Sequence, residues 1–190
     1  MDEALIALLS CDLDAGFERL VRTYQDRIYG LALSLTGNTR DAEEVAQDAF
    51  VRAHRALSGY PPERIRELKL RAWLHRIALN VVRNRVRVRR VATQPLDSAA
   101  ELADTVTSAP ETVALRRESA EELRCLVAAL PAGYREAVVL RHVQQLSYAE
   151  AAEVLGRPVG TVKANVHRGL GLLRLALEGQ RLALEDQEVG

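Results

Sequence analysis

The stretch SYAEAAEVLGRPVGTVKANVHRGL, residues 147–170, contains two short helical patterns on either side of a Gly-Arg-Pro-Val-Gly elbow. Ser147 and Glu150 form a capping-box pattern, which predicts where the first helix begins. Gly156 is expected to end that helix, and Pro158 prevents a straight continuation. A second helix is expected to begin at residues 159–161. Two abutting helices of this kind form either a corner of a helical core or a helix-turn-helix, which places its second helix in a groove of DNA.

The second helix of this stretch has an apolar side and a polar, basic side. Spacing at i, i+4, i+8 and i+11 predicts a buried side made of Val162, Val166, Leu170 and Leu173. The opposite side is expected to expose Thr161, Ala164, Asn165 and Arg168, flanked by Lys163 and His167. Small, polar and basic residues on an outward face are what insertion into the major groove requires, and the amide of Asn165 can pair with adenine. A structural corner would not need this face, so the pattern favours DNA binding.

The composition of the chain favours helices and gives no sign of a metal or membrane protein. Of the 190 residues, 48% are hydrophobic and only 4% aromatic, which favours aliphatic helix packing over a β-sandwich. The two cysteines, Cys11 and Cys125, have no metal-binding spacing and are too few for a disulfide framework. Neither a membrane span nor a leader peptide is recognisable. We therefore expect a cytoplasmic protein without membrane insertion, metal or other cofactor.

The net charge of zero conceals a strong segregation of charge along the chain. Residues 1–50 contain ten acidic and four basic residues, whereas residues 51–92 contain twelve basic and two acidic ones. Residues 93–123 carry a net charge of −5, and residues 131–175 carry +3. Two basic modules separated by an acidic spacer indicate a polyanion bound at two places. Two solvated helical surfaces would give the same asymmetry, so charge alone leaves both interpretations open.

Helical periodicity divides the chain into two lobes. Apart from the opening stretch, three- and four-residue apolar spacing predicts helices over residues 17–35, 42–57, 68–90, 111–130 and 134–143. Residues 58–62 are expected to form a loop. Residues 93–110, rich in Ala, Ser, Thr, Asp and Pro, indicate a flexible linker. With no strand pattern or internal repeat, we predict an all-α protein of two small helical domains joined by a flexible acidic linker.

The helix predicted over residues 68–90 carries a stripe of basic and amide side chains. The stripe contains Arg76, Asn80, Arg83, Arg87 and Arg90, and it is widened by Arg71, His75, Arg85 and Arg89. Arginines bind phosphates or base edges, and Asn80 and Asn84 can hydrogen-bond bases. A solvated face is the alternative, although no matching row of acids lies within the helix. Trp73 could stack on an unpaired base, but we favour a place in the core.

The helix whose apolar side runs from residue 42 to residue 57 is expected to expose a mostly acidic stripe on its other side. This stripe contains Asp41, Glu44, Asp48 and Arg52, with Gln47 beside them. Taken alone, such a pattern is typical of a solvated face, and acids near the N-terminus of a helix also favour its dipole.

Three motifs occur together in one order: DAEEVAQDAFVRAHRAL at residues 41–57, RAWLHRIALNVVRNRVR at 71–87 and LSYAEAAEVLGRPVGTVKANVHRGLGLLR at 146–174. Together they resemble the extracytoplasmic-function (ECF) sigma factors of bacterial RNA polymerase, a group within the sigma-70 superfamily. The resemblance implies four segments: a region 2 domain at 14–92, a flexible acidic linker at 93–111, a region 4 domain at 112–176 and an acidic tail at 177–190.

The resemblance also implies a role for each surface. The acidic stripe would bind the coiled coil of the polymerase's largest catalytic subunit through Asp41, Glu44, Gln47, Asp48 and Arg52. The basic helix, with the loop at 60–68, would recognise and open the −10 promoter element through His75, Arg76, Asn80, Arg83, Asn84 and Arg87. The helix-turn-helix would read the −35 element as duplex through Arg157, Thr161, Lys163, Asn165, His167 and Arg168. The polymerase flap region and an anti-sigma factor are the further partners implied.

The sequence departs from the family pattern at two places, and two other classes of protein are less well supported by it. The family commonly has Ser-Arg where Ala164 and Asn165 stand, and often Asp where Asn84 stands, so its promoter preferences do not transfer. A free-standing helix-turn-helix regulator with an N-terminal sensing or dimerisation domain would have no need of the arginine stripe. An enzyme is not predicted, because no paired carboxylates, Ser/His arrangement or phosphate loop is recognisable.

Overall fold

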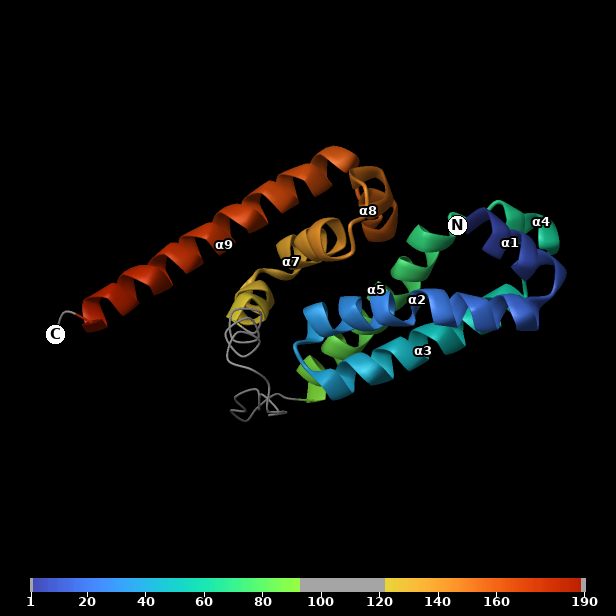
Figure 1. Ribbon diagram of the computed structural model, residues 1–190, viewed down its shortest axis with the longest axis horizontal. Helices are drawn as coiled ribbons and strands as arrows, with labels where there is room; N and C mark the ends of the chain where they lie inside the picture. Colours follow the sequence, from blue (N-terminus) through green and yellow to red (C-terminus); the bar gives the residue numbers. More distant parts are fainter. Residues whose placement is uncertain (1, 93–121, 189–190) are drawn as a thin grey trace. The chain divides into compact units, whose positions relative to one another are not determined.

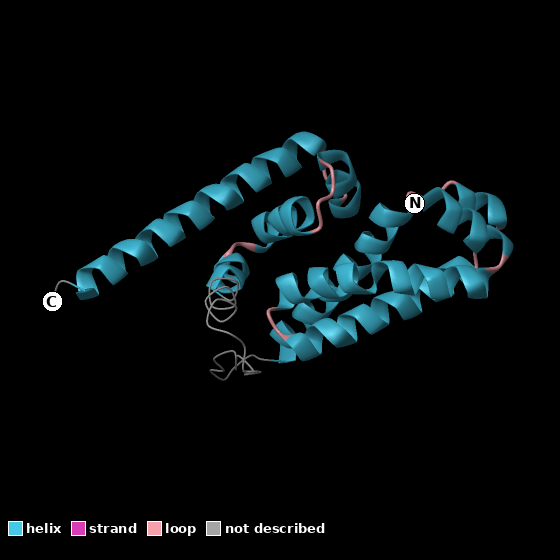
Figure 2. Ribbon diagram, viewed as in Figure 1, coloured by secondary structure: helices cyan, strands magenta, loops and turns pink. Residues whose placement is uncertain are grey.

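The computed structural model describes residues 2–92 and 122–188, and the side chains of residues 2–88 and 122–179. Every regular element in these ranges is a helix (Figure 2). The chain divides into two compact units, one with the helices before residue 93 and one with the helices after residue 121 (Figure 1). The prediction of an all-α protein with two small domains is confirmed. The predicted linker lies outside the described residues.

The N-terminal unit is built around one long helix. Its elements are α1 (Asp2–Cys11), α2 (Leu13–Thr36), α3 (Thr39–Ser58), α4 (Pro62–Arg66) and α5 (Leu70–Ala92). Helix α2 packs against α1, α3 and α5, as the blue to green ribbons of Figure 1 show. The buried stripe of α2 comprises Leu20, Tyr24, Ile28, Leu31 and Leu35, as its spacing predicts. The apolar face of α3 comprises Ala42, Val45, Ala49, Ala53 and Leu57.

The boundary between α2 and α3 follows from its sequence. Gly37 ends α2 in the left-handed conformation with φ 69°, and its N–H donates to the carbonyl of Leu33. Asn38 then caps α3, and its side-chain oxygen accepts a hydrogen bond of 3.0 Å from the backbone N–H of Asp41. These two residues turn the chain so that α3 runs back along α2.

Two short helices of this unit were not predicted. Helix α1 buries Leu5 and Leu9, and it is tied to α2 by the hydroxyl of Tyr24, which donates to Asp2 Oδ1 over 2.9 Å. Burial, assisted by this hydrogen bond, raises the pKa of Tyr24. Helix α4 lies within the predicted loop at 60–68 and buries Ile65. Pro62 fits this helix because its fixed φ suits the first helical position.

The C-terminal unit contains α7 (Ala132–Val138), the π-helix η1 (Val139–Val143), α8 (Tyr148–Leu155) and α9 (Val159–Glu188). The predicted capping box is confirmed: Glu150 N donates to Ser147 Oγ over 3.2 Å, and Ser147 N donates to Glu150 Oε2 over 2.8 Å. Gly156 ends α8 with φ 64°, which permits the sharp turn into α9. The helix-turn-helix is therefore present where the sequence predicts it.

Helix α9 lies against α7 along a face that differs in part from the predicted one. Val162, Val166 and Leu173 are buried as expected, but Leu170 is 41% exposed. Gly169 takes its place: a Cβ there would lie 2.6 Å from Val138 Cγ2, so the backbone of α9 approaches α7 closely because this residue has no side chain. The helix continues past the expected domain end at 176 to Glu188.

Candidate nucleic-acid and polymerase-binding surfaces

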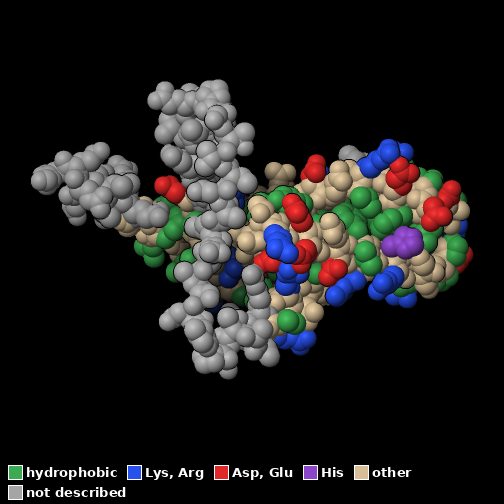
Figure 3. Space-filling model, turned by 90° about the horizontal axis from the view of Figure 1, so that it is seen from below, with side chains coloured by type: hydrophobic (Ala, Val, Ile, Leu, Met, Phe, Trp, Pro, Cys, Tyr) green, Lys and Arg blue, Asp and Glu red, His purple; other side chains and the backbone are tan. Residues whose placement is uncertain are grey.

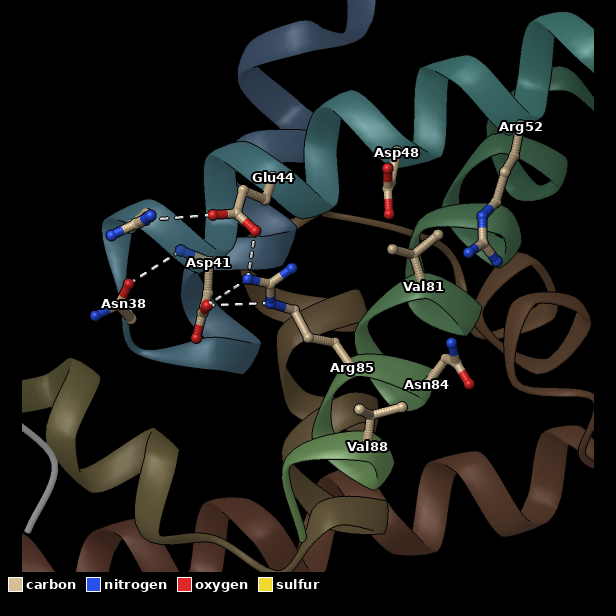
Figure 4. A pocket seen from close by; sticks show the side chains of 10 residues that line it. Asn38, Asp41, Glu44, Asp48, Arg52, Val81, Asn84, Arg85 and Val88 are labelled. Atoms are coloured by element: carbon tan, nitrogen blue, oxygen red, sulfur yellow. Dashed lines mark hydrogen bonds and ion pairs between the residues drawn. The ribbon is translucent and has the colours of Figure 1, made fainter. Parts of the chain in front are cut away.

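A charged groove lies between α3 and α5 in the N-terminal unit. It has a volume of about 550 Å³. The residues lining it come from both helices and from the cap of α3: Asn38, Arg40, Asp41, Glu44, Asp48, Arg52, Val81, Asn84, Arg85 and Val88 (Figure 4). The groove thus includes four of the five residues predicted to bind polymerase. Gln47 is exposed on α3 and does not line it.

Arg85 occupies the centre of this groove and binds two carboxylates of α3. Its Nε donates to Asp41 Oδ1 over 3.0 Å, and its Nη2 lies 2.9 Å from the same oxygen and 2.5 Å from Glu44 Oε2. Figure 4 shows this guanidinium reaching from α5 to both acids. The hydrogen bond from Arg85 is the main cause that lowers the pKa of Glu44, and the same bond raises the pKa of Arg85.

These contacts correct the expected outward stripe of α3. Asp41 is only 7% exposed, so the prediction that it lies on an outward face is wrong. It sits in the first turn of α3, faces α5 and is neutralised there by Arg85, which is what permits a carboxylate to be buried. Glu44 is half-buried, whereas Asp48 and Arg52 are exposed and point into the groove (Figure 4).

The basic helix α5 exposes most of the predicted stripe. Arg76, Asn80, Asn84 and Arg87 are exposed, and Arg83 is half-buried. Arg87 Nη2 donates to Asn84 Oδ1 over 2.9 Å, so two of the predicted DNA contacts are paired with each other. Arg85, which seemed to widen the stripe, instead faces α3. Side chains beyond Val88, including Arg89 and Arg90, lie outside the described ones.

His75 does not belong to the exposed stripe. Its side chain is fully buried, and Nδ1 lies 2.8 Å from the carbonyl oxygen of Arg71, to which it donates. The prediction of an exposed His75 that contacts DNA is therefore wrong. The residue falls on the same helical line as Ala72 and Leu79, which are also buried, so its place in the helix turn decides its burial.

Two aromatic rings join the segment before α4 to α5. Trp73 is half-buried, and its ring meets the ring of Tyr60 edge-on, with 6.4 Å between their centroids. The guanidinium of Arg64 lies 3.8 Å from the centre of the Tyr60 ring. The segment at 60–68 is thus held against α5 by an aromatic contact that the sequence did not reveal. Elsewhere on this unit, Figure 3 shows acidic and basic side chains interspersed.

The helix-turn-helix exposes five of its six predicted DNA-binding residues: Arg157, Thr161, Lys163, His167 and Arg168. Ala164 is exposed among them. Asn165 is only 8% exposed, so the prediction that it lies on the outermost line of α9 is wrong. Its neighbours Val162 and Gly169, three and four residues away, are buried against the rest of the unit, and Asn165 shares their side of the helix.

Tyr148 links three parts of this unit. Its ring lies at the start of α8, 5.1 Å from the guanidinium of Arg141 and 5.6 Å from the ammonium of Lys163. Cations at these distances are attracted to the face of an aromatic ring. This arrangement holds Lys163 near the N-terminus of α8. Neither Tyr148 nor Arg141 belongs to the residues that the sequence pattern predicts to bind DNA.

Within the described residues, no cluster of His, Cys, Asp and Glu is arranged to hold a metal ion. The helices of the same ranges include none that is long and apolar enough to cross a membrane. Cys11 and Cys125 are both exposed and not disulfide-bonded.

Known proteins resemble the chain in both units. Residues 20–104 match the family Sigma-70 region 2, and residues 120–173 match Sigma-70, region 4. The ECF RNA polymerase sigma factor SigW of Bacillus subtilis is 35% identical over 176 residues, or 87% of this chain and 90% of SigW. The RNA polymerase sigma-H factor of Pseudomonas aeruginosa is 30% identical over 185 residues, or 93% and 94% of the two chains.

A solved structure of a similar protein agrees with these sequence matches. The structure of CnrH in complex with the cytosolic domain of CnrY is similar with a TM-score of 0.68 and 29% identity, over 94% of this chain and 97% of that one. Fold and surfaces define a helical DNA-binding protein with a helix-turn-helix in its second unit. The chain belongs to the ECF RNA polymerase sigma factors of the sigma-70 family. The predicted family is thereby confirmed, and a free-standing regulator is not favoured.

Proposed function

We propose that the two units divide promoter recognition between them. The N-terminal unit binds core polymerase through α3 and opens the −10 element through α5, and the C-terminal unit reads the −35 element as duplex through α9. The observation that supports this division is that each family-matched region exposes its own row of basic or amide side chains, one on α5 and one on α9. Such side chains bind phosphates and base edges.

The polymerase contact is proposed for the exposed part of the α3 stripe. Asp48, Arg52 and Gln47 are accessible, whereas Asp41 and Glu44 are engaged by Arg85. We expect Asp48→Arg to reduce co-purification of core polymerase, since reversed charge at a complementary interface weakens association. Asp26→Arg, an equal charge change on the exposed face of α2, serves as the control. If both variants recovered the same amount of core polymerase, with unchanged circular dichroism, Asp48 would not be a polymerase contact.

The −35 contact is proposed for Thr161, Lys163, His167 and Arg168, with Arg157 beside them. Lys163→Ala and Arg168→Ala should each weaken holoenzyme binding on all −35 sequences alike, and each should lower the salt slope by roughly one unit. His167→Ala should instead alter the preferred −35 sequence in a promoter-library transcription assay. If the slope of the logarithm of the binding constant against the logarithm of the salt concentration were unchanged in Lys163→Ala and Arg168→Ala, these α9 residues would not contact phosphates.

We also propose that an anti-sigma protein binds this chain and covers its polymerase-binding surface. The related CnrH was solved in complex with the cytosolic domain of CnrY, which supports a protein partner of this kind. The chain would act in the cytoplasm, where the polymerase acts, and by binding rather than by catalysis. Capture of such a partner by wild-type protein, and its loss with Asp48→Arg, would place that partner on α3.

A further inference from the structure

Between residues 83 and 88, the described part of α5 has no buried apolar side chain. Leu74, Ala78 and Val81 are buried on the line that faces α3 and α2. After Val82, every described apolar side chain of the helix is exposed: Val86 by 40% and Val88 by 58%. The next position on the buried line, four residues after Val81, is Arg85. From this position, Arg85 binds α3 through its guanidinium.

Arg85 bridges the two helices through charge-assisted hydrogen bonds. Its guanidinium binds Asp41, which is buried, and Glu44, which is half-buried, at distances of 2.5–3.0 Å. Asp41 is itself fixed, because its backbone N–H is bound by the cap residue Asn38. Two hydrogen bonds from one planar guanidinium to two carboxylates set the geometry more narrowly than a single ion pair.

Arg85 lies in the same turn of α5 as Asn84 and Arg87, two of the residues proposed to contact the −10 element. Asn84 is its direct neighbour, and Arg87 follows two residues later and donates to Asn84. Both are exposed, while Arg85 points to α3 (Figure 4). We propose that Arg85 is a positioning residue for promoter opening, which fixes the DNA-binding end of α5 relative to the polymerase-binding helix α3. This inference rests on the proposed function of α5.

The chain offers a matched control in Arg40. Arg40 Nε lies 3.3 Å from Glu44 Oε1, so Arg40 and Arg85 share one carboxylate. Arg40, however, belongs to α3 itself, four residues before Glu44, and its side chain is 88% exposed. Removing either arginine deletes one positive charge beside Glu44. Only the removal of Arg85 breaks the charged bridge between α5 and α3.

The experiment compares full-length variants in holoenzyme with core polymerase. Arg85→Met should lower open-complex formation on a duplex promoter by at least about tenfold, because it removes the charge-assisted hydrogen bonds to both Asp41 and Glu44. Permanganate reactivity of the −10 thymines measures this loss. Recovery of core polymerase and the circular dichroism spectrum should stay unchanged. Arg40→Met should match the wild type. Arg85→Lys, which keeps the charge but cannot bridge both acids in the same plane, should be intermediate and covers the case in which Arg85→Met does not fold.

A second variant separates positioning from direct DNA contact. Asp41→Asn keeps Arg85 but weakens its ion pair with residue 41. If Arg85 acts by positioning α5, this variant should form fewer open complexes, as Arg85→Met does. If Arg85 itself bound DNA, freeing it would leave opening unchanged or increase it, and that result would overturn the inference. Equal activity of Arg85→Met and Arg40→Met would overturn it as well. If Arg83→Ala and Arg87→Ala also left opening unchanged, the proposed function of α5 would fail instead.

Discussion

At the scale of single residues, the Asp41–Arg85–Glu44 cluster shows how a charged pair is kept inside a small helical unit. Asp41 is nearly buried and loses hydration, which Arg85 offsets only because it is aligned with the carboxylate. Such pairs add little net stability compared with apolar residues, but deletion of one partner leaves an uncompensated charge. Glu44 is more exposed, and its pKa is lowered chiefly by the hydrogen bond from Arg85.

The lowered pKa of Glu44 predicts a pH-dependent contribution to stability. A carboxylate with a lowered pKa in the folded state stabilises the fold above its unfolded pKa, and this stabilisation is lost as the pH falls through the folded pKa. The melting temperature of Glu44→Gln should therefore lie below that of the wild type near neutral pH, and the difference should shrink below about pH 4.3, the ordinary glutamate value. Circular dichroism melts from neutral to acidic pH measure it. A difference that stays constant over this range would contradict the prediction.

Two glycines of α9 predict opposite effects of the same substitution. A Cβ at Gly169 would lie 2.6 Å from the buried Val138 side chain, whereas one at Gly171 meets nothing within 4 Å. Gly169→Ala should destabilise the C-terminal unit by about 1–3 kcal/mol through overpacking. Gly171→Ala should stabilise it by about 0.5–1 kcal/mol, since alanine is the better helix former. Urea unfolding of both variants tests the pair, and equal free energies of unfolding would show that α7 and α9 do not pack closely.

Residue-level burial was the least predictable feature of the sites. In α9, the apolar spacing correctly predicted that Val162, Val166 and Leu173 are buried. It also predicted a buried Leu170, whereas Gly169 is the buried residue. A glycine adds no hydrophobic signal, although its small size is what brings two helices together. The shift of the stripe toward Gly169 buries Asn165. The burial of His75 was predicted wrongly for a similar reason. A polar side chain on the buried side of a helix has the same sequence pattern as one at the edge of the polar side.

At the scale of elements, boundary signals were more informative than side-chain type. The capping box at Ser147 lies where the sequence places it. Helices α1 and α4 were missed because ten and five residues carry too little periodicity, and such short helices depend on packing for their stability. The predicted helix at 134–143 ends in a π-turn, in which Gln144 N donates to Val139 O over 2.9 Å, and spacing alone does not reveal such a turn.

The capping box predicts how the first helix of the helix-turn-helix responds to mutation. Ser147→Ala removes the acceptor for the backbone N–H of Glu150 and should cost about 1 kcal/mol of stability. Because Tyr148 lies in the first turn and approaches Lys163, holoenzyme binding to the −35 element should weaken too. Ser147→Asp keeps an acceptor at the cap and should restore both properties. Thermal unfolding and −35 binding are the measurements, and a Ser147→Ala variant as stable as the wild type would exclude the cap as a source of stability.

At the scale of the whole molecule, each unit presents one helix that is proposed to bind DNA, and one such helix alone offers few base contacts. Charge segregation in the sequence correctly indicated two basic modules, and the family match explains why both occur in one chain. We propose that the spacing between the two modules is set by a partner that binds both units. Core polymerase is the proposed partner that sets it.

This dependence predicts weak promoter binding by the protein alone. Two modules joined by a linker gain affinity over one module only when both sites can be reached at once in a favourable geometry. Docking on core polymerase would fix that geometry, so binding to a −35/−10 promoter should be tight and sequence-specific in holoenzyme but weak in the free protein at physiological salt. A fluorescence-anisotropy titration of one promoter with free protein and with holoenzyme measures both. A variant promoter with a lengthened spacer between the two elements serves as the control, and it should weaken holoenzyme binding while leaving the free protein unaffected. Nanomolar, sequence-specific binding by the free protein would show that the units are already positioned without polymerase.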